Sequence, residues 1–138
     1  MKVSPMTSGK SLNSDTHIKV PVSLGEFCDR LCILKVKADK LSSQGSLKAV
    51  DAEELYQTWL RCGQDAAAFS HKGDYMVLLK RLTDIHSELW DLETSVRNGT
   101  VGIEDYVRIT EKNNDRHAVK ARLDLMAGHL SEPKEYHA

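Results

Sequence analysis

Several charged, aromatic and amide side chains of this 138-residue chain are spaced so that they could line a site between helices. Trp90, Glu93 and Arg97 recur every three or four residues, which places them along one face of a helix. Arg30 and Lys37 are seven residues apart and share the flank of another helix. Arginine and lysine bind carboxylates and phosphates, so we expect a small anionic ligand. The complete predicted ligand-binding set is Arg30, Lys37, Trp90, Glu93, Arg97, Asn114, Asp115, Arg116 and Lys120.

The same residues also fit a purely structural interpretation. Glu93 and Arg97, at a spacing of four, could form a local ion pair on a solvated face that is worth only ~0.3–0.5 kcal/mol. Asn114 could be a polar core residue that sets the register of neighbouring helices. Spacing alone does not separate the two interpretations, because both place these side chains on the same helix faces.

One enzyme class fits part of the sequence. All-helical, metal-dependent nucleotide pyrophosphohydrolases have an acidic pattern of Glu-Glu-x-x-Glu followed by Glu-x-x-Asp, and their Mg²⁺ prefers oxygen ligands. This chain resembles that pattern at Glu53 and Glu54, and again at Glu88 and Asp91. Gln57 stands where the third carboxylate of the first motif would be. The class is therefore a weaker alternative.

A helical enzyme similar to chorismate mutase would instead hold a dicarboxylate with Arg30, Lys37 and Arg97. No motif specific to that class is present, and the sequence contains neither a serine nucleophile elbow nor a phosphate-binding glycine loop. No pair of residues stands out as a general acid and base. The sequence therefore assigns no catalytic residue and leaves open whether the protein is an enzyme.

Cysteine and histidine side chains could bind a metal, but their spacing favours packing. Cys28 and Cys32 are four residues apart and could chelate Zn²⁺ with Cys62 or a histidine. The chain has no CxxC pair, and its six histidines form no HxxxH or HExxH pair. Because a free cysteine behaves as a small hydrophobic residue, we predict no metal and no other cofactor. We expect His86 and His117 to lie nearest the interior.

The composition is that of an ordinary globular protein, with 41% hydrophobic and 28% charged residues. Nineteen basic residues against twenty acidic ones leave a formal charge of −1, without the basic excess typical of nucleic-acid binding. No apolar run approaches the ~18–20 residues of a membrane span, and the N-terminus has no apolar signal segment. Together with an odd number of cysteines, these features predict a cytoplasmic protein that binds neither nucleic acid nor membrane.

Apolar residues at alternating spacings of three and four predict an all-α fold with about four helices. The first helix begins at a capping box, in which Ser23 and Glu26 accept hydrogen bonds from each other's backbone amides, and it ends at residues 42–46. A second, less regular helix covers residues 47–63, and residues 64–73 are ambiguous. Connections of a few residues predict an antiparallel bundle.

The third and fourth predicted helices differ in regularity. Residues 75–96 carry the most regular apolar row, which ends at Asn98 and Gly99. The fourth helix covers residues 103–127, and its predicted inward row is apolar at both ends and polar in the middle. We expect this polar middle to be the first place to look for a function. The predicted inward row is Ile103, Val107, Thr110, Asn114, Ala121 and Leu125.

These elements predict one domain at residues 18–130. Residues 1–17 are rich in Ser, Lys, Thr and Gly and have no periodicity, so we expect a disordered leader. Residues 131–138 contain Pro133 and are expected to form a loose C-terminal tail.

Three blocks of the sequence carry a family resemblance. Residues 20–37 read VPVSLGEFCDRLCILKVK, residues 88–97 read ELWDLETSVR, and residues 114–120 read NDRHAVK. They are similar to the patterns PVSxGExxDKxxILxIK, LWxIEDxIR and NDxRxxxK of a family of small all-helical proteins from bacteria and their phages, whose function is not established. The resemblance implies the helical fold and a shared set of polar positions, and it implies no activity.

Two positions depart from these patterns. Thr94 stands where the second pattern has an acidic residue. Arg116 directly follows Asp115, one place earlier than the third pattern has its arginine. The positions of a family site are therefore not copied one by one onto this chain.

A second class of function is protein interaction. Regular apolar rows on the first and third helices could pair with another chain, and Tyr56, Trp59 and Tyr75 could be free to contact it. The protein would then be a homodimer or a partner-binding module, and its polar residues would have no ligand. Convergence of the predicted ligand-binding set on one concavity would favour the first hypothesis instead.

Overall fold

The computed structural model describes residues 17–100 and 102–131. In these residues it has four α-helices, one 3₁₀-helix and no strand, which confirms the predicted all-α bundle. None of these helices combines the length and the apolar character needed to cross a membrane. The predicted leader and tail lie outside the described residues, apart from His17 and Ser131. The elements are α1 (Leu24–Ser43), α2 (Ala49–Cys62), η3 (Gln64–Phe69), α3 (Tyr75–Arg97) and α4 (Ile103–Ala127).

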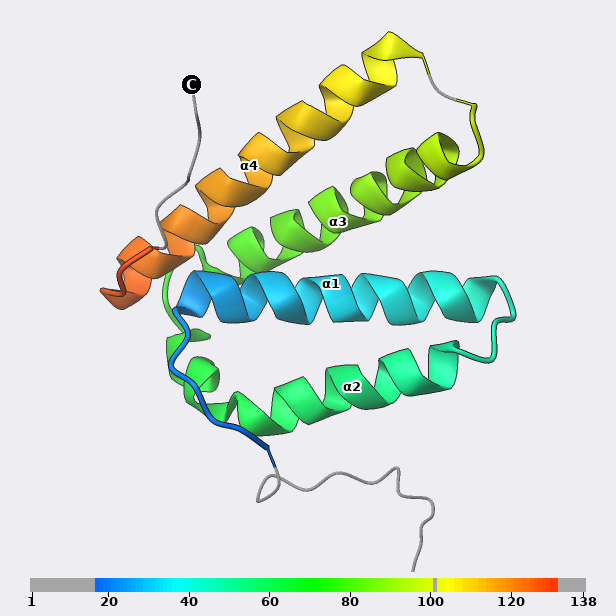
Figure 1. Ribbon diagram of the computed structural model, residues 1–138. Helices are drawn as coiled ribbons and strands as arrows, with labels where there is room; N and C mark the ends of the chain where they lie inside the picture. Colours follow the sequence, from blue (N-terminus) through cyan, green and yellow to red (C-terminus); the bar gives the residue numbers. More distant parts are fainter. Residues whose placement is uncertain (1–16, 101, 132–138) are drawn as a thin grey trace, which may run out of the picture.

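Helix α1 lies at the centre of the fold, with α2 antiparallel to it on one side and the antiparallel pair α3 and α4 on the other (Figure 1). It contacts each of the other three α-helices, and α3 contacts α4. Ten of the twenty residues of α1 are buried, against two of the fourteen in α2. A polar side chain of α1 that faces α3 and α4 is therefore removed from water and needs a partner inside the fold.

The apolar core lies mainly between α1 and α3. The row predicted on the third helix is confirmed from Tyr75 to Leu89, where its residues are buried at spacings of three and four, while its last members, Leu92 and Val96, are partly buried. Cys28 and Cys32 belong to the same core, as predicted. Full burial of a leucine side chain contributes ~1.5–3 kcal/mol, so this cluster is the main source of stability. Its members are Leu24, Phe27, Cys28, Leu31, Cys32, Tyr75, Leu78, Leu82, Ile85, Leu89, Val119 and Leu123.

Three aromatic residues that the sequence left free for a partner are used inside the fold. Tyr75 is buried in the core, so its prediction as a free contact residue was wrong. Trp59 is partly buried and stacks on Phe27, with ring centroids 5.8 Å apart. Tyr56 also packs against the core. The rings of Tyr56 and Trp59 are therefore not available to a partner, because α2 packs against α1 through them.

The predicted inward row of the fourth helix was wrong. All six of its residues are exposed, including Ile103 at 80% and Leu125 at 78%. The buried residues of α4 are Val119, Leu123 and Asp124, and the two apolar ones lie roughly on the opposite side of the helix. The physical reason is that the buried side of α4 also carries charged groups, which pair with groups of opposite charge on α1.

Candidate functional site

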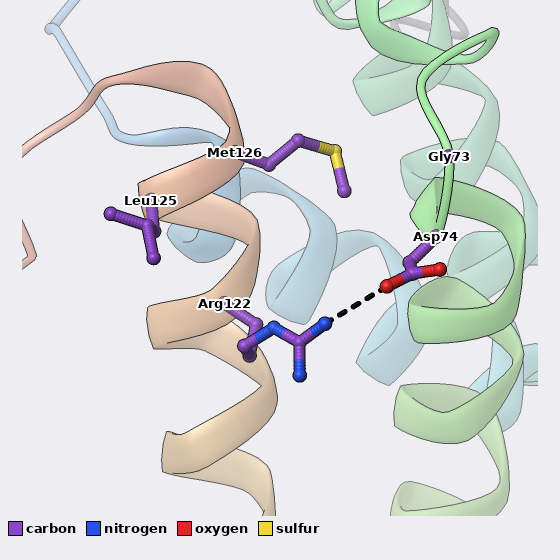
Figure 2. A pocket seen from close by; sticks show the side chains of 5 residues that line it. All are labelled: Gly73, Asp74, Arg122, Leu125 and Met126. Carbon is purple, nitrogen blue, oxygen red and sulfur yellow. Dashed lines mark hydrogen bonds and ion pairs between the residues drawn. The ribbon is translucent and has the colours of Figure 1, made fainter.

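An open depression of about 310 Å³ lies between the start of α3 and the end of α4 (Figure 2). A terminal nitrogen of Arg122 donates a hydrogen bond to Asp74 Oδ2 across it, at 2.9 Å. None of the nine residues predicted to bind a ligand lines this depression. The lining residues are Gly73, Asp74, Arg122, Leu125 and Met126.

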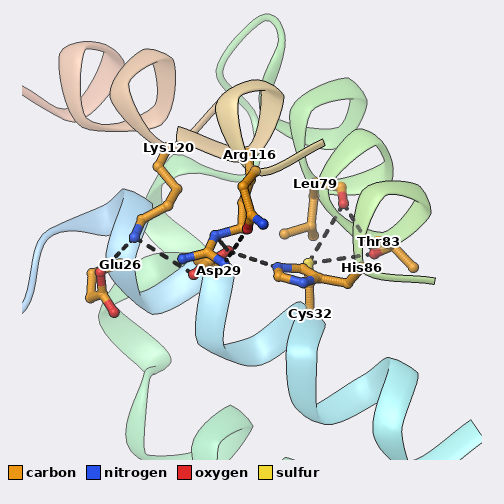
Figure 3. A network of polar contacts seen from close by, with 9 residues as sticks. Glu26, Asp29, Cys32, Leu79, Thr83, His86, Arg116 and Lys120 are labelled. Carbon is orange, nitrogen blue, oxygen red and sulfur yellow. Dashed lines mark hydrogen bonds and ion pairs between the residues drawn. The ribbon is translucent and has the colours of Figure 1, made fainter. Parts of the chain in front are cut away.

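A buried carboxylate, Asp29 of α1, is the centre of a separate polar network (Figure 3). Asp29 is 2% exposed, and its Oδ1 accepts a hydrogen bond of 2.7 Å from Nε2 of His86, which is 7% exposed. Arg116 Nε lies 3.4 Å from Oδ1, and Lys120 Nζ lies 3.6 Å from Oδ2. Lys120 also donates to Glu26 Oε1 at 2.9 Å. We call these five residues, from α1, α3 and α4, the Asp29 network.

Helix spacing explains why these groups meet. Glu26 and Asp29 are three residues apart on α1, and Arg116 and Lys120 are four residues apart on α4, so each pair shares one helix face. The two acidic groups of α1 therefore face the two basic groups of α4, and their charges cancel. Such pairing is required because an isolated charge at this depth would lose several kcal/mol of hydration.

The network keeps the Asp29 carboxyl ionised. Burial by itself would raise its pKa, because a charged group is poorly solvated inside the protein. The hydrogen bond from His86 and the positive charges of Arg116 and Lys120 outweigh burial and lower the pKa of Asp29 below its ordinary value. Asp29 is thus a permanent acceptor, and His86 donates to it from Nε2.

Arg116 is held only partly by the protein. One terminal nitrogen of its guanidinium donates to Asn113 Oδ1 at 3.1 Å. Its Nε is buried and has no hydrogen-bond partner, although Asp29 lies close enough for a charge interaction. Within the described parts of the chain, this is one of two buried side-chain polar atoms left unsatisfied. A buried donor of this kind is unusual and marks Arg116 for closer attention.

The first turn of α1 is bound by residues beyond the end of α4 and by α4 itself. The Leu24 amide donates to His129 Nδ1 at 2.9 Å, and the Gly25 amide donates to Asp124 Oδ1 at 2.6 Å. Asp124 also accepts from the Ser131 hydroxyl at 2.7 Å. A helix N-terminus attracts anions, but here the carboxylate of Asp124 already occupies that position. This end of α1 is therefore not free for a ligand.

The predicted capping box is present only in its first half. The Glu26 amide donates to Ser23 Oγ at 3.1 Å, as predicted. The Glu26 carboxylate, which was expected to reach back to the Ser23 amide, instead accepts from Lys120. The physical reason is that a charged ammonium group on α4 is a stronger partner than a backbone amide.

Gly25 allows α1 and α4 to approach closely at this point. A Cβ atom added to it would lie 2.7 Å from Asp124 Oδ1 and even closer to the Lys120 carbonyl oxygen. Any larger residue would push the two helices apart. The contacts of Asp124 and Lys120 with α1 therefore depend on a glycine at this position.

The cysteines of α1 face α3 and are unreactive. Cys28 Sγ lies 3.8 Å from the Tyr75 hydroxyl, and Cys32 Sγ accepts from Thr83 Oγ1 at 3.4 Å. Burial raises the pKa of Cys28 to about 11 and that of Cys32 to about 12. Both are therefore protonated thiols at neutral pH. Cys62, the third candidate ligand, is exposed on α2.

The structure brings two of the nine predicted ligand-binding residues into the Asp29 network. These are Arg116 and Lys120. Trp90 and Asp115 are partly buried and are not members of the network. The exposed members, which also lie outside it, are Arg30, Lys37, Glu93, Arg97 and Asn114. The expected Glu93–Arg97 pair is replaced by a hydrogen bond from Arg97 to Thr94 Oγ1, at 3.0 Å.

Sequence reasoning missed Glu26 and Asp29, and placed His86 near the interior without giving it a partner. A signal was available, because two acidic residues at a spacing of three on one helix complement two basic residues at a spacing of four on another. The first and third blocks of the family resemblance also contain these positions, as GExxD and R-x-x-x-K. The acidic pair was overlooked because one of its members was assigned to a capping box.

The carboxylates of the pyrophosphohydrolase pattern do not form a metal site. Glu53 accepts a hydrogen bond from Gln57 on α2, while Glu88 pairs with Lys112 of α4. Asp91 pairs with Lys40 of α1. Among the described residues, no group of three or more His, Cys, Asp or Glu side chains could hold a metal ion.

Comparison with protein-family models, with curated proteins and with solved structures finds no match for this chain.

Proposed function

We propose that the protein binds a small anionic ligand, a carboxylate or a phosphate monoester, through Arg116 and Lys120 at the edge of the Asp29 network. The observation that carries this proposal is the buried Arg116 Nε, an N–H group without a hydrogen-bond partner. Asp29 Oδ1 lies 3.4 Å from this nitrogen and forms an ion pair with it, but no hydrogen bond is made. An oxygen atom of a ligand is the group that would supply the missing hydrogen bond.

The chemistry of the two basic side chains suits an anion with two or more oxygens. An arginine presents Nε and a terminal nitrogen side by side, as a fork that matches a carboxylate or phosphate. The bond from Arg116 to Asn113 restricts the plane of this fork. Lys120, one helical turn later, adds a second positive charge on the same side of α4.

Asp29 does not prevent such binding, because its short contact is with His86. The His86 hydrogen bond is 2.7 Å long, whereas Arg116 and Lys120 lie 3.4 and 3.6 Å from the carboxylate. A ligand could therefore replace Asp29 as the partner of Arg116 while Asp29 keeps its hydrogen bond to His86.

The test is a thermal-shift screen followed by titration calorimetry, with inorganic phosphate, phosphate monoesters and dicarboxylates as probes. A probe at 100 times its dissociation constant should add about 2.7 kcal/mol of stability. Arg116→Gln should abolish that shift, and Arg116→Lys should weaken it because the fork is lost. Arg108→Gln is the matched control, because it removes the same charge from an exposed part of α4.

Two results would count against the proposal. One is the absence of any shift with all probes at millimolar concentration. The other is an equal shift in the Arg116→Gln and Arg108→Gln proteins, which would mean that the anion binds elsewhere.

A further inference from the structure

The carboxylate of Glu26 lies within reach of two different partners. The first is the ammonium group of Lys120, which donates a hydrogen bond of 2.9 Å to Glu26 Oε1 (Figure 3). In this pair the side chain of Glu26 is 39% exposed, whereas that of Lys120 is only 16% exposed. Glu26 is therefore the outer member of the Asp29 network, and it can turn away without opening the apolar core.

The second partner is the backbone amide of Ser23. Ser23 is the N-cap of α1 and Glu26 follows it by three residues, which is the spacing at which a glutamate accepts from the N-cap amide. The backbone already has the conformation that this contact needs, because Ser23 is extended and the Glu26 amide donates to Ser23 Oγ. Only the side chain of Glu26 has to rotate to complete the capping box.

Helix α4 shows the completed contact in the same protein. Asp105 follows the N-cap Gly102 by three residues, the position that Glu26 has in α1. The Gly102 amide donates to Asp105 Oδ2 at 3.1 Å. The two helices thus differ in what their third residue binds, since Asp105 binds its own helix and Glu26 binds Lys120. Aspartate at this position is long enough to reach the N-cap amide.

We propose that Glu26 is an internal competitor for the anion site, an inference that rests on the proposed function. In the ligand-free protein its carboxylate occupies Lys120. When an anion binds Arg116 and Lys120, Glu26 turns to the Ser23 amide. The ligand then faces one carboxylate fewer, and the displaced carboxylate gains a hydrogen bond at the positive end of the α1 dipole.

The contacts of Lys120 and Asp29 explain why Glu26 is the group that moves. Lys120 Nζ also lies 3.6 Å from Asp29 Oδ2, so it keeps an opposite charge beside it when Glu26 leaves. Asp29 is buried and is held by the 2.7 Å hydrogen bond from His86. Only an anion that binds Lys120 better than the Glu26 carboxylate does can enter the site, so Glu26 contributes to selectivity.

Calorimetric titration with inorganic phosphate and with succinate tests the competition. Glu26→Gln removes the competing charge and should lower the dissociation constant roughly five- to tenfold. Glu26→Asp keeps the charge and can still close the box, but its carboxylate reaches ~1.5 Å less far towards Lys120. It should lower the dissociation constant roughly threefold. Glu88→Gln is the matched control, because it removes a carboxylate from another pair with α4, and it should bind like the wild type.

The movement of Glu26 has its own signal in the NMR spectrum of the wild type. Saturation with the anion should shift the Ser23 amide proton downfield, because this proton gains a carboxylate acceptor. The Gly102 amide proton is the internal reference, since Asp105 binds it with or without the anion. A Ser23 proton that does not shift at saturation would overturn the movement.

The binding results separate this inference from the proposed function. Binding that is lost in Arg116→Gln, but is equally tight in the wild type and both Glu26 variants, would overturn the competition and leave the anion site in place. Tighter binding by Glu26→Gln alone would also overturn it, because net charge would then explain the gain. Absence of binding in every protein, with both anions, would overturn the competition and the proposed function together.

Discussion

Helices α3 and α4 bury faces of different character. The buried face of α3 is apolar from Tyr75 to Leu89, with His86 as its one polar member. The inner face of α4 combines two core residues, Val119 and Leu123, with the charged Arg116, Lys120 and Asp124, while its predicted apolar row lies in solvent. The difference shows that α3 is oriented by apolar burial, whereas the orientation of α4 depends on apolar burial together with charges and hydrogen bonds supplied by α1.

The free energy that is lost when the charged groups of α4 are buried is offset by their pairing with groups of α1. Each charge that α4 turns inwards finds an opposite charge or a backbone amide on α1, and Gly25 keeps the two helices close enough for these contacts. A buried charged pair is seldom more stable than an apolar contact of the same size, but it strongly disfavours other helix orientations. We therefore expect the network to select the orientation of α4 as well as to stabilise it.

The largest expected effect comes from two leucines of α4 that lie two residues apart on different faces. Leu123 is fully buried and Leu125 is 78% exposed. Leu123→Ala should lower the free energy of unfolding by about 2–5 kcal/mol, because it leaves a cavity. Leu125→Ala should change it by less than ~0.5 kcal/mol. Urea unfolding at micromolar concentration measures both, and equal losses would show that the two faces of α4 are assigned wrongly.

Removal of the central carboxylate is expected to have the next largest effect. Asp29→Asn should lower the free energy of unfolding by about 3 kcal/mol, because Arg116 and Lys120 lose the charge that they face. Asp39→Asn removes a carboxylate of the same helix whose exposed pair with Lys35 should be worth no more than ~1 kcal/mol. Chemical unfolding distinguishes the two, and similar losses in both variants would mean that the Asp29 network adds nothing to stability.

A smaller loss is expected when the close approach of α1 and α4 is disturbed. Gly25→Ala should destabilise the protein by about 1–3 kcal/mol, because the new methyl group meets the Lys120 carbonyl and Asp124. Gly73→Ala is the matched control, since nothing lies within 4 Å of its added Cβ. That control should be neutral or stabilising by up to ~1 kcal/mol. A tolerated alanine at position 25 would show that the two helices can separate without loss.

The smallest expected effect is the pH dependence of the free energy of unfolding that arises from Asp29. Its pKa is lower in the folded protein than in the unfolded chain, where it is about 3.9. Its contribution is therefore complete above that value and is lost as the pH falls through the lower, folded pKa. The difference in unfolding free energy between the wild type and Asp29→Asn should narrow from pH 5 to pH 3. Parallel curves in urea titrations over this range would contradict the assignment.

The fold class was predictable because it depends on local spacing. Four helices, the apolar row of α3 and the left-handed glycine at position 99 all follow from residues close together in the sequence. The orientation of α4 was not predictable in the same way. The exposed apolar row of α4 and its charged inner face both have helical spacing. A prediction based on hydrophobicity therefore chooses the apolar row as the buried one.

The candidate site was predictable only in part, for the same reason. Arg116 and Lys120 were identified from their charge, but their partner Asp29 lies on a helix almost ninety residues earlier. A carboxylate in a predicted apolar helix reads as a surface residue until the helix that covers it is known. Arg30 and Lys37 were selected by spacing alone, and they lie on the exposed flank of α1.

The hydrogen bonds that hold the first turn of α1 determine when this turn becomes fixed during synthesis. Its Leu24 and Gly25 amides are bound by residues 105 and 99 positions further along the chain. At ~5–20 residues per second, a ribosome would complete α1 roughly 5 to 20 seconds before His129 and Asp124 are made. During that interval the start of the helix can fray, and no neighbouring segment supplies these acceptors. The beginning of the domain is thus among the last parts of the nascent chain to become fixed.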